Sequence, residues 1–179
     1  MSKYKSVIKS IGEFVVIFII MYLIFTLVVI PVKIQGSSME NNLHDGELAL
    51  VNGLNKKNVD RFDVVIIYSD ELDENLIKRV IGLPGETIEY KDDKLYVDGE
   101  YVEETFLDES YMERMKSQSD LDYFTEDFEI TVGEDEIFVM GDNRLNSYDS
   151  RELGCFSYSD IKGKEGIILY PFSEMGWVE

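Results

Sequence analysis

At 179 residues, the chain is long enough for one domain and an additional segment. It carries 36 acidic and 17 basic side chains, and the net charge of −19 argues against nucleic acid as a partner, because phosphates attract basic surfaces. Cys155 is the only Cys and His44 the only His, which excludes an internal disulfide and a Cys-based zinc site, so we expect no metal and no cofactor. Apolar residues make up 45% of the chain, which is enough to build a folded core.

The N-terminal part contains a long apolar segment. Residues 14–32 are 19 residues without a charge, bounded by Glu13 and Lys33, and as a helix they would span roughly 28 Å, close to the hydrocarbon thickness of a bilayer. Several Lys residues precede the segment. The positive-inside rule therefore predicts residues 1–13 in the cytoplasm and residues 33–179 outside the cell membrane.

This segment differs from a cleaved signal peptide. Its apolar run is longer than usual, and no Ala-x-Ala cleavage site follows, because Ala49 is the only Ala of the chain. We therefore predict an uncleaved, single-pass transmembrane anchor in contact with the lipid bilayer. Pro31 is expected to end or kink its helix.

The extracytoplasmic part has the pattern of a mainly β domain. Strands are expected at residues 46–51, 61–68, 76–81, 87–90, 94–102, 128–132, 136–140 and 161–170. Residues 103–127 are polar and acidic, and they predict a variable surface excursion with a short helix around residues 111–117. Residues 172–177 form an aromatic tail that we expect to pack into the core.

Two adjacent basic residues, Lys78 and Arg79, interrupt an apolar strand. Alternation places their side chains on opposite faces of the sheet, so one of the two is expected to point inward. A hydrolase without a usable His base can employ a neutral Lys to activate a Ser, and Ser38, just beyond the apolar segment, is the natural partner of Lys78. A thiol enzyme would instead need Cys155 near His44, and an aspartic protease would need paired Asp residues; the order of the residues favours Ser and Lys.

Four motifs resemble those of the type I signal peptidases of the Gram-positive kind, which are membrane-bound Ser/Lys peptidases. Gly-Ser-Ser-Met at residues 36–39 resembles the nucleophile box, and Arg-Phe-Asp-Val-Val at residues 61–65 resembles the second box. Residues 78–86 closely match the lysine box, and the polar run at residues 141–151 matches the last box almost fully. The motifs follow the family's order, and the resemblance covers about residues 10–171 apart from the excursion.

The resemblance implies a role for each matched residue. Ser38 would be the nucleophile, Lys78 the general base, and the backbone N–H of Ser38 would stabilise the oxyanion. Ser147 would hydrogen-bond to the amine of Lys78 and orient it. The remaining supporting residues would be an ion pair of Asp149 with Arg151, and Asp142 nearby.

The substrate would bind as an added strand whose small side chains enter apolar pockets. By the resemblance, the residues lining these pockets are Ile34, Met39, Leu43 and Ile77. The family pattern continues Ser-Met-x-Pro-Thr, whereas Asn41 and Asn42 stand here in place of Pro and Thr. Asn fixes no backbone dihedral, so this departure bears on the rigidity of the nucleophile loop and on the class of substrate.

The resemblance thus implies a signal-peptidase-like β-sheet or β-barrel catalytic domain behind one N-terminal transmembrane helix. The expected activity is that of a serine endopeptidase that cleaves signal peptides from exported preproteins, with pilins as one candidate class of substrate. An alternative is a chaperone or scaffold for pilin assembly with weak or no peptidase activity. A self-cleaving repressor shares the Ser/Lys pair, but the anchor and the lack of a DNA-binding segment argue against it.

Lys78 must be neutral to accept the proton of Ser38. Lowering the pKa of a free Lys from about 10.4 to roughly 8 takes about 3.3 kcal/mol. Apolar neighbours such as Val80 and Ile81 supply a shift of the right sign by desolvating the amine, whereas the negative charge of the domain opposes it. Local desolvation should dominate, since fields beyond about 8 Å are screened at physiological salt.

We therefore predict an alkaline activity optimum that moves to lower pH as the salt concentration is raised. Salt screens the carboxylates that stabilise the ammonium form of Lys78, so its pKa should fall. The measurement is the pH dependence of preprotein cleavage at several ionic strengths. An optimum that does not respond to salt would remove the acidic field from this account.

Overall fold

The computed structural model describes residues 2–54 and 58–178. Its helices are α1 (Ser2–Val28), α2 (Glu109–Ser119) and α3 (Ser150–Leu153), with short 3₁₀ turns η1 (Arg144–Asn146), η2 (Tyr158–Asp160) and η3 (Phe172–Glu174). The first strands are β1 (Val29–Lys33), β2 (Leu48–Asn52), β3 (Val64–Ser69), β4 (Glu74–Gly82), β5 (Thr87–Lys91) and β6 (Lys94–Val97). The others are β7 (Glu100–Val102), β8 (Phe128–Thr131), β9 (Glu136–Met140), β10 (Phe156–Ser157), β11 (Ile161–Tyr170) and β12 (Gly176–Val178).

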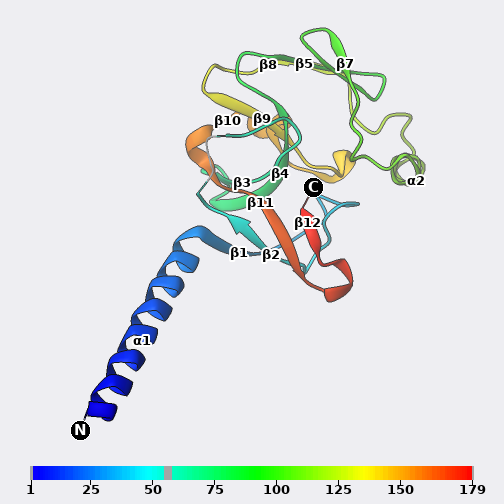
Figure 1. Cartoon of the computed structure of the whole chain (residues 1–179). Coiled ribbons are helices and arrows are strands. Elements are labelled where there is room, and N and C mark those ends of the chain that lie inside the picture. Colours follow the sequence, from blue (N-terminus) through cyan, green and yellow to red (C-terminus); the bar gives the residue numbers. More distant parts are fainter. Residues whose placement is uncertain (1, 55–57, 179) are drawn as a thin grey trace.

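Two sheets build the domain, which confirms the mainly β prediction (Figure 1). The larger sheet has eight strands in the order β1-β2-β11-β3-β4-β9-β10, with β12 paired to β11. The smaller sheet has four strands in the order β7-β6-β5-β8. The β5, β6 and β7 strands make an antiparallel meander, and the Asp98-Gly99 turn joins the last two of them.

The core occupies both faces of the larger sheet. On one face of β4 and β9, Val80 and Val139 pack with Val65 and Ile67 of β3. On the other face, apolar residues of β4 and β9 pack against the smaller sheet. Both faces of β4 are therefore covered, and for this reason both of its basic residues, Lys78 and Arg79, are buried.

The apolar segment does not stay helical to the end that the sequence predicted. Helix α1 ends at Val28, and residues 29–33 pair with β2 as an antiparallel edge strand in which Pro31 lies opposite Leu50. The β-branched residues 29, 30 and 32 favour a strand, and an edge strand tolerates the missing N–H of Pro. Among the residues that the structure describes, no helix combines the length and the apolar character required to cross a membrane.

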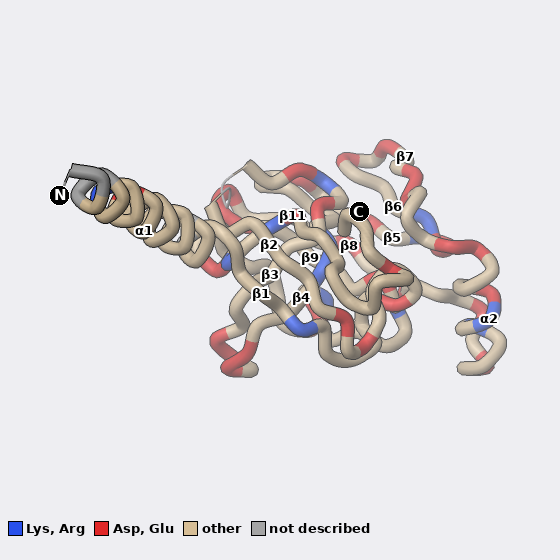
Figure 2. Tube along the Cα trace, turned by 60° about the horizontal axis from the view of Figure 1, so that its bottom comes forward, with Lys and Arg blue, Asp and Glu red and all other residues tan. Residues whose placement is uncertain are grey.

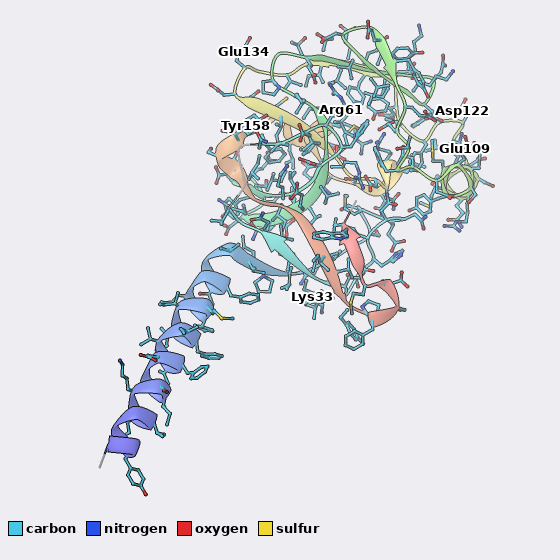
Figure 3. The ribbon with its side chains drawn as sticks, viewed as in Figure 1. Lys33, Arg61, Glu109, Asp122, Glu134 and Tyr158 are labelled. Carbon is cyan, nitrogen blue, oxygen red and sulfur yellow. The ribbon has the colours of Figure 1, made fainter. Side chains whose placement is uncertain are left out.

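Helix α1 projects away from the domain, as Figure 1 shows, and Figure 2 shows it almost free of charge apart from its N-terminal end. The acidic residues are distributed over the loops of the domain. In Figure 3, Lys33 lies at the lower edge of the domain, whereas Glu109 and Asp122 lie at the flank formed by the excursion. The excursion folds as predicted around a short helix, α2.

The aromatic tail is not part of the core, so that prediction was wrong. Phe172 is 77% exposed and Trp177 is 71% exposed. The reason is the position of β12, a short strand at the margin of the sheet that pairs only through residues 176–178 with β11. Side chains alternate along it, and that of Trp177 faces outward.

Candidate active site

Ser38 and Lys78 line a common groove of about 850 Å³. One wall consists of residues 30–36 with the loop that follows β1, and the other consists of residues 74–78 of β4. Ser38 is half-buried at this groove, and only 3% of Lys78 is exposed. The two residues that the sequence singled out for chemistry are thus brought to one surface from positions 40 residues apart.

The position of Lys78 follows from the pairing of β4. Lys78 lies opposite Val65 of β3, whereas the pairing with β9 begins only at Arg79. In the described part of the chain, residues 74–78 therefore have a strand on one side and the groove on the other. An extended peptide could pair with this free edge.

The last polar box, residues 141–151, holds the main chain of the loop that carries Ser38. Asn143 donates its backbone N–H to the carbonyl oxygen of Ser38 at 3.0 Å and its side-chain amide to the carbonyl oxygen of Ser37 at 3.1 Å. Asn146 donates to the Ser37 hydroxyl at 2.7 Å. A Cβ atom at Gly141 would clash with the Ser38 carbonyl oxygen and with Ser147 Oγ. Glycine at this position is what allows the two boxes to approach so closely.

Ser147, Asp149 and Arg151 form a short chain of hydrogen-bonded side chains near Lys78. Ser147 donates its hydroxyl to Asp149 Oδ2 at 2.7 Å, and the same carboxylate accepts the backbone N–H of Gly141 at 2.9 Å. Arg151 binds both carboxylate oxygens of Asp149 at 2.9 Å. Burial would raise the pKa of Asp149, but the guanidinium of Arg151 and these hydrogen bonds outweigh it and hold the pKa below its usual value. Orientation of the Lys78 amine by Ser147 stays a prediction.

Burial lowers the pKa of Lys78 to about 8. Desolvation is the largest cause; the carboxylate of Asp149 acts against it, and the nearby Arg151 acts with it. Asp142 and Glu152 oppose the shift more weakly. The balance is the one that the sequence suggested, with local desolvation stronger than the acidic surroundings. A substantial fraction of the amine is neutral at mildly alkaline pH, as a general base requires.

Both basic residues of the strand are buried, although alternation along the strand predicted that only one of them would point inward. Arg79 is 1% exposed and binds Asp142 through two hydrogen bonds of 2.8 and 2.7 Å. It also donates to the carbonyl oxygen of Phe62 at 2.9 Å. Lys78 and Arg79 do face opposite sides of the sheet, but both faces of β4 are covered. Lys78 lines the groove on one side, and Arg79 forms its ion pair with Asp142 on the other.

The predicted pocket residues form one apolar cluster. Its members are Ile34, Met39, Leu43 and Ile77, together with Val64, Ile168 and Val178. Ile34, Met39 and Ile77 also line the groove beside Ser38, whereas Leu43 lies behind them in a smaller cavity of about 20 Å³. The cluster can therefore shape the floor on which the side chains of a bound peptide rest.

Several residues around the loop that carries Ser38 could not be predicted from the sequence. Asn143 and Asn146 lie in the last box, but a motif gives no sign of which of its Asn residues reach another loop. Asn42 was noticed only as a departure from the family pattern, yet its side chain makes two hydrogen bonds. Phe106 had no sequence signal, because the excursion lacked a clear pattern.

Comparisons with known proteins show the family of the chain. The family described as signal peptidase, peptidase S26, matches residues 7–170. Signal peptidase I U of Bacillus subtilis is 43% identical over 181 residues, which cover 97% of this chain and 94% of that protein. Signal peptidase I S of the same species is 38% identical over 178 residues, covering 97% and 95% of the two chains.

A crystal structure of a signal peptidase I from Enterococcus faecalis is also similar. It is 35% identical and superimposes with a TM-score of 0.51, covering 60% of this chain and 97% of that one. The fold and the groove define a serine-peptidase-like β domain. The chain belongs to the signal peptidase family, peptidase S26, and is thus a peptidase, a hydrolase.

Replacing Lys78 by Met should stabilise the fold at neutral pH while it removes the amine. The folded-state pKa of about 8 lies below the unfolded value of 10.5, so protonated Lys78 opposes folding. This cost, about 3 kcal/mol at most, is fully present below pH 8 and disappears as the pH rises through the interval up to the unfolded pKa. Urea unfolding of the detergent-solubilised chain, followed by circular dichroism, measures the difference.

The exposed Lys94 provides the control, because Lys94→Met removes an amine that stays in water. Its unfolding free energy should follow that of the wild type at every pH. If Lys78→Met gives no more stability than Lys94→Met at pH 7, the amine of Lys78 is not desolvated in the folded chain.

Proposed function

We propose that the chain is a signal peptidase I, a membrane-anchored serine endopeptidase that removes signal peptides from exported preproteins by a Ser/Lys dyad. The observation that carries the proposal is the placement of Ser38 and of a buried Lys78, with a pKa of about 8, along one groove. The family membership supports the reaction class. The alternative of an inactive scaffold for pilin assembly has no comparable observation in its favour.

In the proposed reaction, neutral Lys78 accepts the hydroxyl proton of Ser38 as Ser38 Oγ attacks the scissile carbonyl carbon. The backbone N–H of Ser38 donates to the oxyanion; in the described residues it donates no other hydrogen bond. Lys78 then protonates the leaving amine, which frees the mature protein and leaves an acyl-enzyme. A water molecule, deprotonated by Lys78, attacks the acyl carbon, and Ser38 Oγ leaves with the proton.

The signal peptide would bind as an added strand along residues 74–78, on the side of β4 that has no partner strand in the described chain. Its small side chains would rest on the cluster that contains Ile34, Met39 and Ile77. Ser147, whose hydroxyl is held by Asp149, would accept a hydrogen bond from the amine of Lys78 and orient it. Pilins remain one candidate class of substrate.

The uncharged part of α1, residues 14–28, would anchor the enzyme to the cell membrane, with the N-terminus in the cytoplasm and the catalytic domain outside. Support comes from the absence of charge in this stretch and from the exposed apolar side chains along α1, such as Phe14 and Phe18. Water would solvate these side chains unfavourably, whereas a bilayer would accept them. Near the membrane, the groove is within reach of a preprotein whose signal peptide is still embedded.

Ser38→Ala and Lys78→Ala should each reduce preprotein cleavage by about a thousandfold or more, because each removes a group that acts in the bond-forming step. Ser173→Ala is the control, since it removes an exposed hydroxyl outside the groove and should retain most of the activity. The measurement is cleavage of a preprotein by the solubilised full chain. Failure of the wild type on a wide panel of preproteins, with tight binding retained by both site variants, would favour the scaffold.

A further inference from the structure

Asn42, which replaces the Thr of the family pattern, connects two distant parts of the chain. Its side-chain Nδ2 donates to Asp142 Oδ2 at 2.7 Å and to the carbonyl oxygen of Phe106 at 3.0 Å. An amide nitrogen carries two hydrogens, so both donors are used. A Thr hydroxyl has one proton and could serve only one of these two acceptors.

The carboxylate that Asn42 binds is itself held firmly. Asp142 is 1% exposed and accepts two charge-assisted hydrogen bonds from Arg79, at 2.8 and 2.7 Å. Because Arg79 lies on β4 between two strands, this carboxylate is tied to the centre of the sheet. Asn42 is therefore attached to a rigid part of the domain.

The segment that contains Asp142 also holds the main chain at Ser38. Asn143, the residue next to Asp142, donates to the carbonyl oxygens of Ser37 and Ser38. The loop is thus fastened on both sides of Met39, at Ser38 by Asn143 and at Asn42 by Asp142. With both attachments on adjacent residues, a shift of Asn42 would be transmitted to Ser38.

The excursion takes part in this arrangement through Phe106. Its carbonyl oxygen accepts from Asn42, and its ring lies 4.2 Å from the guanidinium carbon of Arg79. The ring also packs against Phe62, with centroids 5.1 Å apart. The segment that lay outside the sequence resemblance therefore contacts three members of one cluster: Asn42, Arg79 and Phe62.

We propose that Asn42 is a positioning residue that holds Ser38 in reach of Lys78, and that the excursion completes this brace through Phe106. In this way a polar side chain with two donors provides the rigidity that Pro and Thr provide in the family pattern. The inference rests on the proposed function, because it assigns Ser38 as the nucleophile.

The test compares Asn42→Ala, Asn42→Thr and Asn42→Asp with Asn41→Ala, a change at the exposed neighbouring residue. Asn42→Ala should lower kcat by about tenfold or more with little change in KM, because the brace acts on the nucleophile and not on substrate binding. Asn42→Thr should fall between Ala and wild type. Asn42→Asp should be the most impaired, since it places a second carboxylate beside Asp142. Asn41→Ala should stay within about twofold of wild type.

All rates are measured where circular dichroism shows each variant to be folded, together with the pH dependence of kcat. The acid limb should stay near the pKa of Lys78 in Asn42→Ala, because the amine keeps its surroundings. A kcat close to that of the wild type, or an acid limb displaced to higher pH by general loosening of the groove, would overturn the positioning role. Ser38→Ala is run alongside: cleavage at the wild-type rate by that variant contradicts the proposed function instead.

Discussion

The burial of the Lys78 amine is the constraint on which the active-site region depends. An ammonium group held out of water is costly, so a buried Lys shifts toward its neutral form. The acidity of the domain acts against this shift, because three carboxylates, those of Asp149, Asp142 and Glu152, favour the charged form of the amine. Desolvation between β3 and the groove still gives a pKa of about 8. The fold thereby loses stability at one position and gains an amine that is partly neutral in mildly alkaline conditions, as the proposed general base has to be.

The proposed reaction also requires that the hydroxyl of Ser38 is held in place, and Ser38 lies in a loop. Polar contacts from the last box, residues 141–151, fix this loop. Gly141 permits the close approach, Asn143 holds the main chain at Ser38, and the ion pair of Arg79 with Asp142 ties the last box to the sheet. Ser147, Asp149 and Arg151 continue the same box toward Lys78. The loop that carries Ser38, strand β4 and the last box are therefore connected by hydrogen bonds and by one ion pair.

Much of this could be predicted from the sequence, but not its polar contacts. Apolar patterns located most strands, and the four boxes singled out Ser38 and Lys78, which the structure brings to one groove. The end of α1 was missed because an apolar, β-branched run favours a helix or an edge strand equally well until its partner, β2, is known. The burial of Arg79 was missed because alternation gives opposite faces but does not say that both are covered. The role of Asn42 depends on Phe106, 64 residues away, and no local pattern encodes such a distant pairing.

The most direct test of the central claim is a titration of the Lys78 amine itself. In the folded Ser38→Ala chain with ¹³C-labelled Lys side chains, the Lys78 Cε signal, assigned by its loss in Lys78→Arg, reports the protonation of Nζ as a function of pH. We predict a midpoint at about 8, well below the 10.5 of an ordinary Lys side chain. A midpoint near the ordinary value of 10.5 would contradict it, because the amine would then be solvated and charged when the peptide bond has to be attacked.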